Sequence, residues 1–130
     1  MSVGVLDAGV AIGWIRRSHR SQAELDRRFA LGQSGRLKLH LSVMNLAAVF
    51  SKLAELSKAT GADPLAILKG VKVQVHIPDE RVARTVSKLP TSLADGFAAA
   101  TAQTLSARLH TTDGELVRQL KGTGIRVTHY

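Results

Sequence analysis

The sequence contains no cysteine among its 130 residues, which excludes disulfide bonds and metal sites built from thiolates. Aromatic residues make up only 4% of the chain while hydrophobic residues make up 45%, so the core has to be built from Leu, Val, Ile and Ala. No apolar run approaches the roughly 18 residues of a membrane span. The apolar N-terminal stretch is interrupted by Asp7 and followed, not preceded, by Arg16 and Arg17, the reverse of the order in a signal peptide. These absences predict a soluble cytoplasmic protein that is not bound to a membrane.

The short motifs of several enzyme classes are also missing. The chain has no glycine-rich phosphate loop and no nucleophile elbow. Its five histidines include no pair spaced i, i+4 of the kind that binds zinc on a helix. Ser92 precedes a helical pattern and is better explained as a helix cap than as a nucleophile.

Negative charge is scarce. Eighteen Lys and Arg residues stand against ten Asp and Glu residues, giving a formal net charge of +8. A balance this basic favours a polyanionic partner, and nucleic acid before a membrane surface. The alternative is a basic surface that serves only solubility.

A short apolar run, residues 3–6, ends on Asp7 at the N-terminus. Apolar residues at nearly every position predict a strand covered on both faces, as in the middle of a parallel sheet. Further strands are predicted at 37–41, 72–77, 108–111 and 125–128, with helices between them, among them a long one at 43–58. Strands that alternate with helices predict one α/β/α sandwich with a five-stranded, mainly parallel sheet, and we interpret residues 1–130 as a single domain.

The long predicted helix has two different faces. Val43, Leu46, Val49, Phe50, Leu53 and Leu56 share an apolar face, and Asn45, Ala48, Lys52 and Glu55 share the opposite one.

Three acidic residues lie either between a predicted strand and the helix that follows it or in the first turn of a predicted helix: Asp7, Asp95 and Asp113. The carboxyl ends of parallel strands meet at one edge of the sheet, so all three side chains can reach the same place. Carboxylates a few ångströms apart raise each other's pKa, and a hard divalent cation such as Mg²⁺ or Mn²⁺ relieves that repulsion. Each acid also has a plain structural interpretation, because Asp7 can cap a helix and Ser92 to Asp95 and Thr112 to Glu115 both fit capping boxes.

Four blocks of the sequence resemble the successive motifs of PIN domains: residues 5–10 (VLDAGV), 45–49 (NLAAV), 92–102 (SLADGFAAATA) and 111–113 (TTD). They follow in the family's order and spacing, and the chain is most similar to the ribonuclease toxins of VapBC-type toxin–antitoxin pairs. The resemblance implies a Mg²⁺- or Mn²⁺-dependent endoribonuclease in which Asp7, Asp95 and Asp113 form the metal and catalytic site, lined by Asn45, Ala48 and Thr111. It also implies a cognate antitoxin, an RNA substrate and a homodimer.

Two departures from the family pattern touch this site. Ala48 stands where the family usually has a glutamate, and Ala8 and Gly9 stand where it tends to have Ser or Thr. Loss of one carboxylate from such a cluster lowers metal affinity or activity by roughly 10- to 100-fold or more. We therefore expect a weakened or inactive ribonuclease, and the alternative is a non-catalytic PIN-fold module that binds RNA or an antitoxin. A phosphoryl-transfer domain is a weaker third interpretation, because no phosphate loop is present. Arg16, Arg17 and Lys52 are candidate contacts for RNA phosphates, chosen by their proximity to the motifs.

Overall fold

The first strand, β1 (Ser2–Leu6), lies at the centre of a five-stranded sheet with the strand order β3-β2-β1-β4-β5. Every pair of neighbouring strands is parallel. On one side β1 pairs with β2 from Ser2 opposite Leu37 to Leu6 opposite Leu41, and on the other side with β4. The predicted parallel sheet with a buried first strand is confirmed in this computed structural model, which describes residues 2–130.

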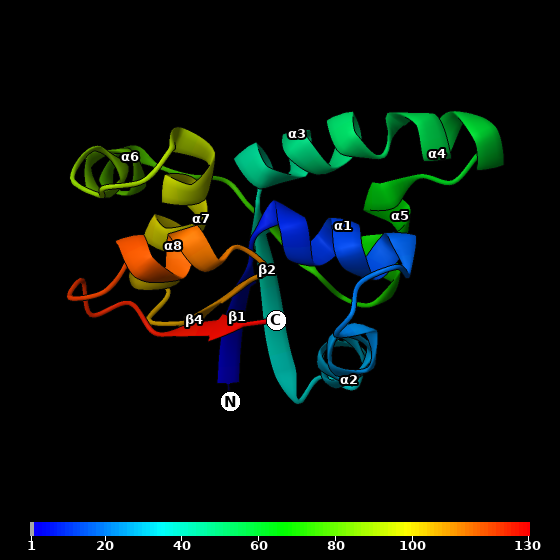
Figure 1. Ribbon diagram of the computed structural model, residues 1–130, viewed down its shortest axis with the longest axis horizontal. Coiled ribbons are helices and arrows are strands. Elements are labelled where there is room, and N and C mark those ends of the chain that lie inside the picture. The colour runs from blue at the N-terminus through cyan, green and yellow to red at the C-terminus, as the bar shows by residue number, and fades with distance from the viewer. Residues whose placement is uncertain (1) are drawn as a thin grey trace.

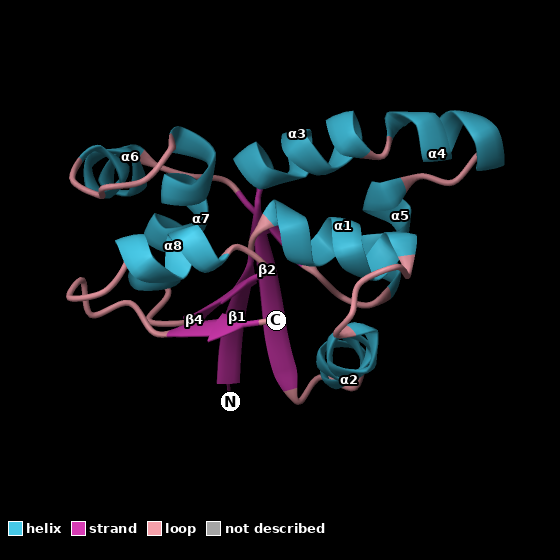
Figure 2. Ribbon diagram, in the orientation of Figure 1, coloured by secondary structure: helices cyan, strands magenta, loops and turns pink. Residues whose placement is uncertain are grey.

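Helices cover both faces of the sheet, as Figures 1 and 2 show with the sheet nearly edge-on in the middle. In that view α6, α7 and α8 lie on one side and α1 to α5 on the other. The remaining strands are β2 (Leu37–Ser42), β3 (Gln74–His76), β4 (Arg108–Thr111) and β5 (Val127–His129). The helices are α1 (Ala8–Arg16), α2 (Gln22–Gln33), α3 (Val43–Lys52), α4 (Ala54–Thr60), α5 (Pro64–Gly70), α6 (Glu80–Ser87), α7 (Leu93–Thr104) and α8 (Gly114–Gln119). Between Ser2 and Tyr130, no helix has the length and apolar character needed to cross a bilayer.

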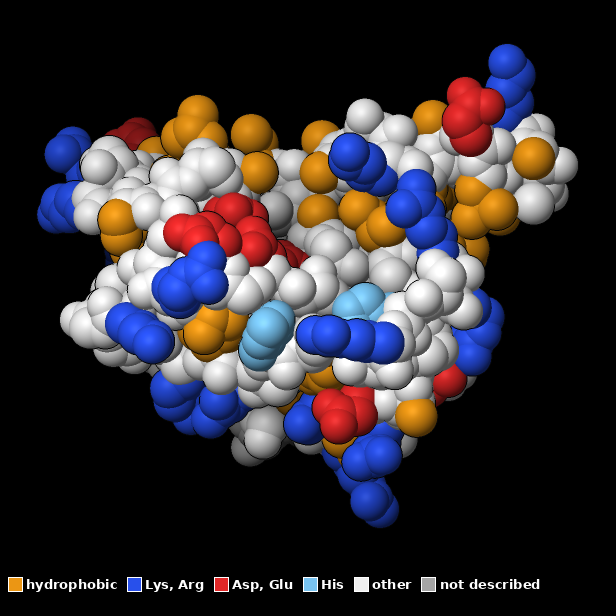
Figure 3. Space-filling model, in the orientation of Figure 1, with side chains coloured by type: hydrophobic (Ala, Val, Ile, Leu, Met, Phe, Trp, Pro, Cys, Tyr) orange, Lys and Arg blue, Asp and Glu red, His pale blue; other side chains and the backbone are white. Residues whose placement is uncertain are grey.

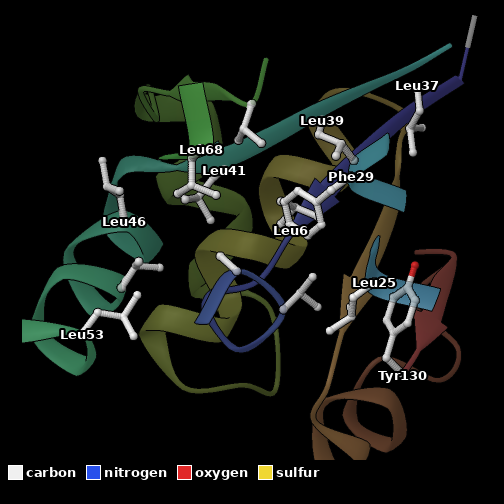
Figure 4. Packing of buried hydrophobic residues seen from close by; sticks show 14 residues of the cluster. Leu6, Leu25, Phe29, Leu37, Leu39, Leu41, Leu46, Leu53, Leu68 and Tyr130 are labelled. Carbon is white, nitrogen blue, oxygen red and sulfur yellow. The ribbon is translucent and has the colours of Figure 1, made fainter. Parts of the chain in front are cut away.

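Side chains from β1 alternate between two hydrophobic cores. Leu6 packs with Leu25, Phe29 and Leu41 in the core beneath α1 and α2 (Figure 4). Val5 points to the other core, which is lined mainly by small residues of α7 and by leucines of β4 and α8. The alanines of α7 let this helix lie close to the sheet, which brings the first turn of α7 to the carboxyl edge of the strands.

The predicted long helix at 43–58 is wrong in one respect, because it is divided at Leu53 into α3 and α4. Leu53 leaves helical geometry (φ −101°, ψ 10°) and is buried in the core, whereas none of the residues of α4 is buried. The predicted apolar face is also only partly correct, because Phe50 and Leu56 are 41% and 37% exposed. Their exposure follows from the position of the core contacts, which α3 makes through Leu46, Val49 and Leu53.

Candidate functional site

Asp7 lies at the carboxyl end of the central strand, where β1 gives way to α1. It is the N-cap of α1, and its Oδ1 accepts a hydrogen bond from the backbone N–H of Val10 at 2.8 Å. Its Oδ2 accepts a hydrogen bond from the hydroxyl of Thr111 on β4. The side chain is 4% exposed, so the carboxylate is held in the interior by two donors from different segments.

Thr111 connects Asp7 to the segment that carries Asp113. While its hydroxyl donates to Asp7, the same oxygen accepts a hydrogen bond from the backbone N–H of Asp113 at 2.9 Å. Asp113 is exposed and is itself the N-cap of α8, since its Oδ1 accepts from the N–H of Glu115 at 2.9 Å. The predicted capping box beginning at Thr112 is therefore wrong by one residue, because the carboxylate of Asp113 takes the capping position.

Asp95 reaches the same region from the first turn of α7. The hydroxyl of Ser92 caps this helix and accepts a hydrogen bond from the backbone N–H of Asp95 at 3.3 Å, which confirms the predicted cap. The side-chain amide of Asn45 on α3 donates to the backbone carbonyl of Ala94 at 3.0 Å. Asn45 thus fixes the start of α7 against α3, and its own Oδ1 is buried with no hydrogen-bond donor in the part of the chain that the structure describes.

Burial and nearby negative charge alter the ionisation of Asp7 and Asp95. Burial raises the pKa of Asp7 from its ordinary value of 3.8 to about 6, against the opposing effect of its hydrogen bonds from Thr111 and Val10. The negative charges of Asp95 and Asp113 raise this pKa further. Burial also raises the pKa of Asp95, its hydrogen bond with Ser92 lowers it, and the charge of Asp113 raises it. This mutual repulsion at the sheet edge is the condition that a bound cation relieves.

Figure 3 shows acidic side chains gathered in the region between α7, α8 and the start of α3. Within residues 2–130, however, no three His, Asp or Glu side chains are arranged so that they could hold a metal ion together. The carboxylates are nevertheless hard oxygen donors of the kind that Mg²⁺ prefers, and the Oδ1 of Asn45, on the helix bonded to the start of α7, is buried without a donor. The capping interpretation is confirmed for Asp7 and Asp113, and capping does not exclude a second role.

The predicted polar face of α3 does not face solvent throughout. Asn45 is buried and Ala48 is half-buried, because α7 covers this side of the helix through the bond from Asn45 to Ala94. Residues three apart on a helix are neighbours, so Ala48 lies one turn from Asn45. Helical side chains lean toward the N-terminus of their helix, and a longer side chain at position 48 would therefore extend toward Asn45 and the start of α7.

The basic residues predicted to contact RNA phosphates lie away from Asp7. Arg16 is at the far end of α1, about 13 Å along the helix axis from its N-cap. Its guanidinium donates to the backbone carbonyl of Lys52 at 2.8 Å, so these two residues lie together at the ends of α1 and α3. Arg17 instead forms a two-point ion pair with Asp26, with bonds of 3.1 and 2.9 Å.

A close contact between α1 and the loop before α8 was not predicted. A Cβ atom built on Gly9 would lie 2.4 Å from Oγ1 of Thr112 and 3.5 Å from Oδ1 of Asp7. Glycine at position 9 therefore allows the loop that carries Asp113 to lie against the first turn of α1. The glycine two residues after the first aspartate was the only sequence signal of this contact.

A scan against protein-family models finds no match, and a search of curated proteins finds none. Solved structures do resemble the chain over almost their whole length. The crystal structure of VapBC2 from Rickettsia felis bound to a DNA fragment from their promoter matches with a TM-score of 0.74 and 14% identity, covering 98% of both chains. A toxin–antitoxin complex from Klebsiella pneumoniae matches with a TM-score of 0.68 and 17% identity, again covering 98% of both chains.

A PilT N-terminus domain protein from Sulfolobus solfataricus matches with a TM-score of 0.59 and 15% identity, covering 98% of this chain and 86% of that one. The coverage of these matches takes in the complete parallel sheet and its covering helices. The chain therefore has the PIN fold that these toxin–antitoxin and PilT N-terminus structures share.

Proposed function

We propose that this chain is the toxin of a toxin–antitoxin pair and that its acidic site is a weakened, metal-dependent endoribonuclease centre. The observation that carries the proposal is the convergence of Asp7, Asp95 and Asp113 from distant segments at the carboxyl edge of the sheet, where the charges of Asp95 and Asp113 add to the burial that raises the pKa of Asp7. The toxin–antitoxin assignment is supported by the solved structures of the same fold, one of which is a toxin–antitoxin complex.

Each residue has a distinct part in the proposed reaction. Asp7 and Asp95 would hold Mg²⁺ or Mn²⁺, and Asp113 would complete the charge cluster or position the attacking water. Thr111 orients the carboxylate of Asp7 through its hydroxyl, and Asn45 holds the first turn of α7 in place. A bound cation would activate water and neutralise the charge on the phosphodiester. The amide oxygen of Asn45, buried without a donor, is a further oxygen available to an ion or its water.

Ala48 is the reason for proposing reduced activity. A carboxylate at this position would lie one turn from Asn45 and would add a fourth acid to the site. Arg16 and Lys52, which lie together at the ends of α1 and α3, remain candidate contacts for RNA beyond the scissile bond. A cognate antitoxin and a homodimer are part of the proposal.

Two observations favour a second candidate, a PIN-fold module that binds RNA or an antitoxin without cutting. One is Ala48, and the other is that no three acidic or histidine side chains in residues 2–130 are arranged to hold a metal ion. In this alternative, Asp7 and Asp113 act as helix caps, and together with Asp95 they give the site its negative charge.

Cleavage of labelled RNA by the purified chain, freed of antitoxin, separates the two candidates. The wild type should cleave the RNA slowly with Mn²⁺ and should not cleave it in EDTA, and Asp95→Ala should show no cleavage. Ala48→Glu should cut roughly 10- to 100-fold faster, the scale of losing one group from such a site. If neither the wild type nor Ala48→Glu shows metal-dependent cleavage, the ribonuclease proposal is excluded and the second candidate, the non-catalytic binding module, is supported. Cleavage that survives EDTA or Asp95→Ala would show that the acidic site is not responsible.

A further inference from the structure

A polar cavity extends to the end of the sheet at which β1 and β2 begin. It has a volume of about 490 Å³, and its lining includes Ser2, Arg28, Ser106, Arg108, His110 and Arg126. Ser2 and Leu37 face each other at the start of β1 and β2. Five residues of extended chain separate Ser2 from Asp7, about 17 Å. A ligand held near Ser2 would lie at the other end of β1 from the carboxylate of Asp7, whereas His110 is the part of the lining that comes nearest to the acidic site, since its carbonyl accepts a hydrogen bond from the backbone N–H of Asp7 at 3.0 Å.

Three arginines from different segments line the cavity, and each is anchored to a neutral oxygen. Nε of Arg28 donates to the hydroxyl of Tyr130 at 2.9 Å. Arg108 donates to the backbone carbonyl of Val127 and Arg126 to that of Ser106, both at 3.2 Å.

None of the three guanidinium groups forms an ion pair with a carboxylate among residues 2–130, although the charge of Glu24 acts on Tyr130, the hydrogen-bond partner of Arg28. Across residues 2–130 the ion pairs join Arg17 to Asp26 and Arg118 to Glu115, and both lie outside the cavity. Three positive charges around one cavity repel one another, and an anion placed between them would relieve the repulsion. Figure 3 shows basic side chains along this lower edge of the molecule.

His110 completes the cavity and responds to the same charges. Its Nδ1 lies 2.8 Å from the hydroxyl of Tyr130, and its ring lies over Gly4, where a Cβ atom would be 2.8 Å from Nε2. Burial lowers the pKa of His110 to about 4, and the positive charges of Arg28 and Arg108 lower it further.

We propose that this arginine cavity binds a phosphomonoester, the terminal phosphate of either a free nucleotide or an RNA 5′ end. Guanidinium groups bind phosphate oxygens through paired hydrogen bonds, and the doubly charged monoester matches three converging arginines better than a backbone diester does. The volume is that of a small-molecule site and not of a long nucleic-acid groove. The hydroxyls of Ser2 and Ser106 can supply further hydrogen bonds. This inference does not depend on the proposed ribonuclease activity.

Calorimetric titration in EDTA and at constant ionic strength tests the proposal with four probes: inorganic phosphate, adenosine 5′-monophosphate, and one short RNA with either a 5′-phosphate or a 5′-hydroxyl. We expect saturable one-to-one binding of at least one phosphomonoester, and the tightest probe identifies the source. The 5′-hydroxyl RNA should bind at least tenfold more weakly than its phosphorylated counterpart. Arg108→Gln and Arg126→Gln should each weaken binding roughly tenfold or more, the scale of one charge-assisted hydrogen bond.

Arg84→Gln is the matched control, because it removes the same charge from an exposed position on α6. It should change affinity less than twofold. If Arg108→Gln lowers the melting temperature, the result with Arg126→Gln decides the test, because Arg126 is exposed and its replacement should leave the fold intact. The proposal is overturned if no phosphomonoester binds saturably, or if Arg84→Gln weakens binding as much as the cavity variants do.

Discussion

Replacement of Asp7 by asparagine should stabilise the protein at neutral pH. The pKa of Asp7 is about 6 in the folded chain and 3.8 when unperturbed, so the folded state binds the proton more tightly. The tighter proton binding adds to the free energy of unfolding. This contribution is fully present below pH 3.8 and is lost as the pH rises through about 6. The difference of about 2 pH units corresponds to about 3 kcal/mol of unfolding free energy forfeited at pH 7.

Asparagine removes the charge and keeps the cap of α1, because it is as good an N-cap as aspartate. It rearranges the bond with Thr111, which reduces the gain by about 1 kcal/mol. Urea unfolding in EDTA at pH 7 should therefore show Asp7→Asn to be more stable than the wild type by roughly 1–3 kcal/mol. At pH 4 the advantage should disappear.

Asp63→Asn is the matched control, since Asp63 is an exposed N-cap whose Oδ1 accepts from the N–H of Leu65 at 3.1 Å. Its effect should stay within about 0.5 kcal/mol at either pH. If Asp7→Asn destabilises the protein equally at pH 7 and pH 4, the buried charge is not what opposes folding, and the reasoning about this site fails.

Three further results are expected. Thr111→Val removes a hydrogen bond that favours the ionised carboxylate of Asp7, so the pKa of Asp7 should rise in a carbon-detected NMR titration. The same variant should lose about 1–3 kcal/mol of stability. An unchanged pKa would refute the role of this hydroxyl. Gly9→Ala should lower stability by about 1–3 kcal/mol in urea unfolding, because the added Cβ atom would clash with the hydroxyl of Thr112. Thr112→Ala should restore most of this loss, and equal losses with and without Thr112 would exclude the clash. Mn²⁺ at about 100 times its dissociation constant should add about 2.7 kcal/mol of stability. This gain should appear as a higher melting temperature that EDTA reverses. A similar gain in Asp95→Asn would show that the ion binds elsewhere.

The arrangement of the sheet could be predicted because local patterns determine it. The uninterrupted apolar run at 3–6 identified the central strand, and the alternation of strands and helices indicated the parallel sheet. The same logic placed Asp7 and Asp113 at one edge, because both follow parallel strands.

Apart from the one-residue error in the cap of α8, which is local, the errors and omissions depend on contacts between distant segments. The burial of Asn45 depends on its bond to Ala94, 49 residues away, and no periodicity within α3 reports it. The break at Leu53 contains neither proline nor glycine, and only the packing of that side chain into the core accompanies it. The arginine cavity likewise joins Arg28 of α2 with Arg108 of β4, 80 positions later in the chain, because both elements border the same end of the sheet.

The central claim is that the acidic edge of the sheet holds a divalent cation. Its most direct test is a crystal structure of the wild-type chain grown with Mn²⁺, with anomalous scattering used to locate the metal. We predict an anomalous peak at coordination distance, about 2.1–2.3 Å, from an oxygen of Asp7 and from an oxygen of Asp95 or Asp113. An acidic edge without a peak at saturating Mn²⁺, or a peak bound only by other residues, would contradict the account.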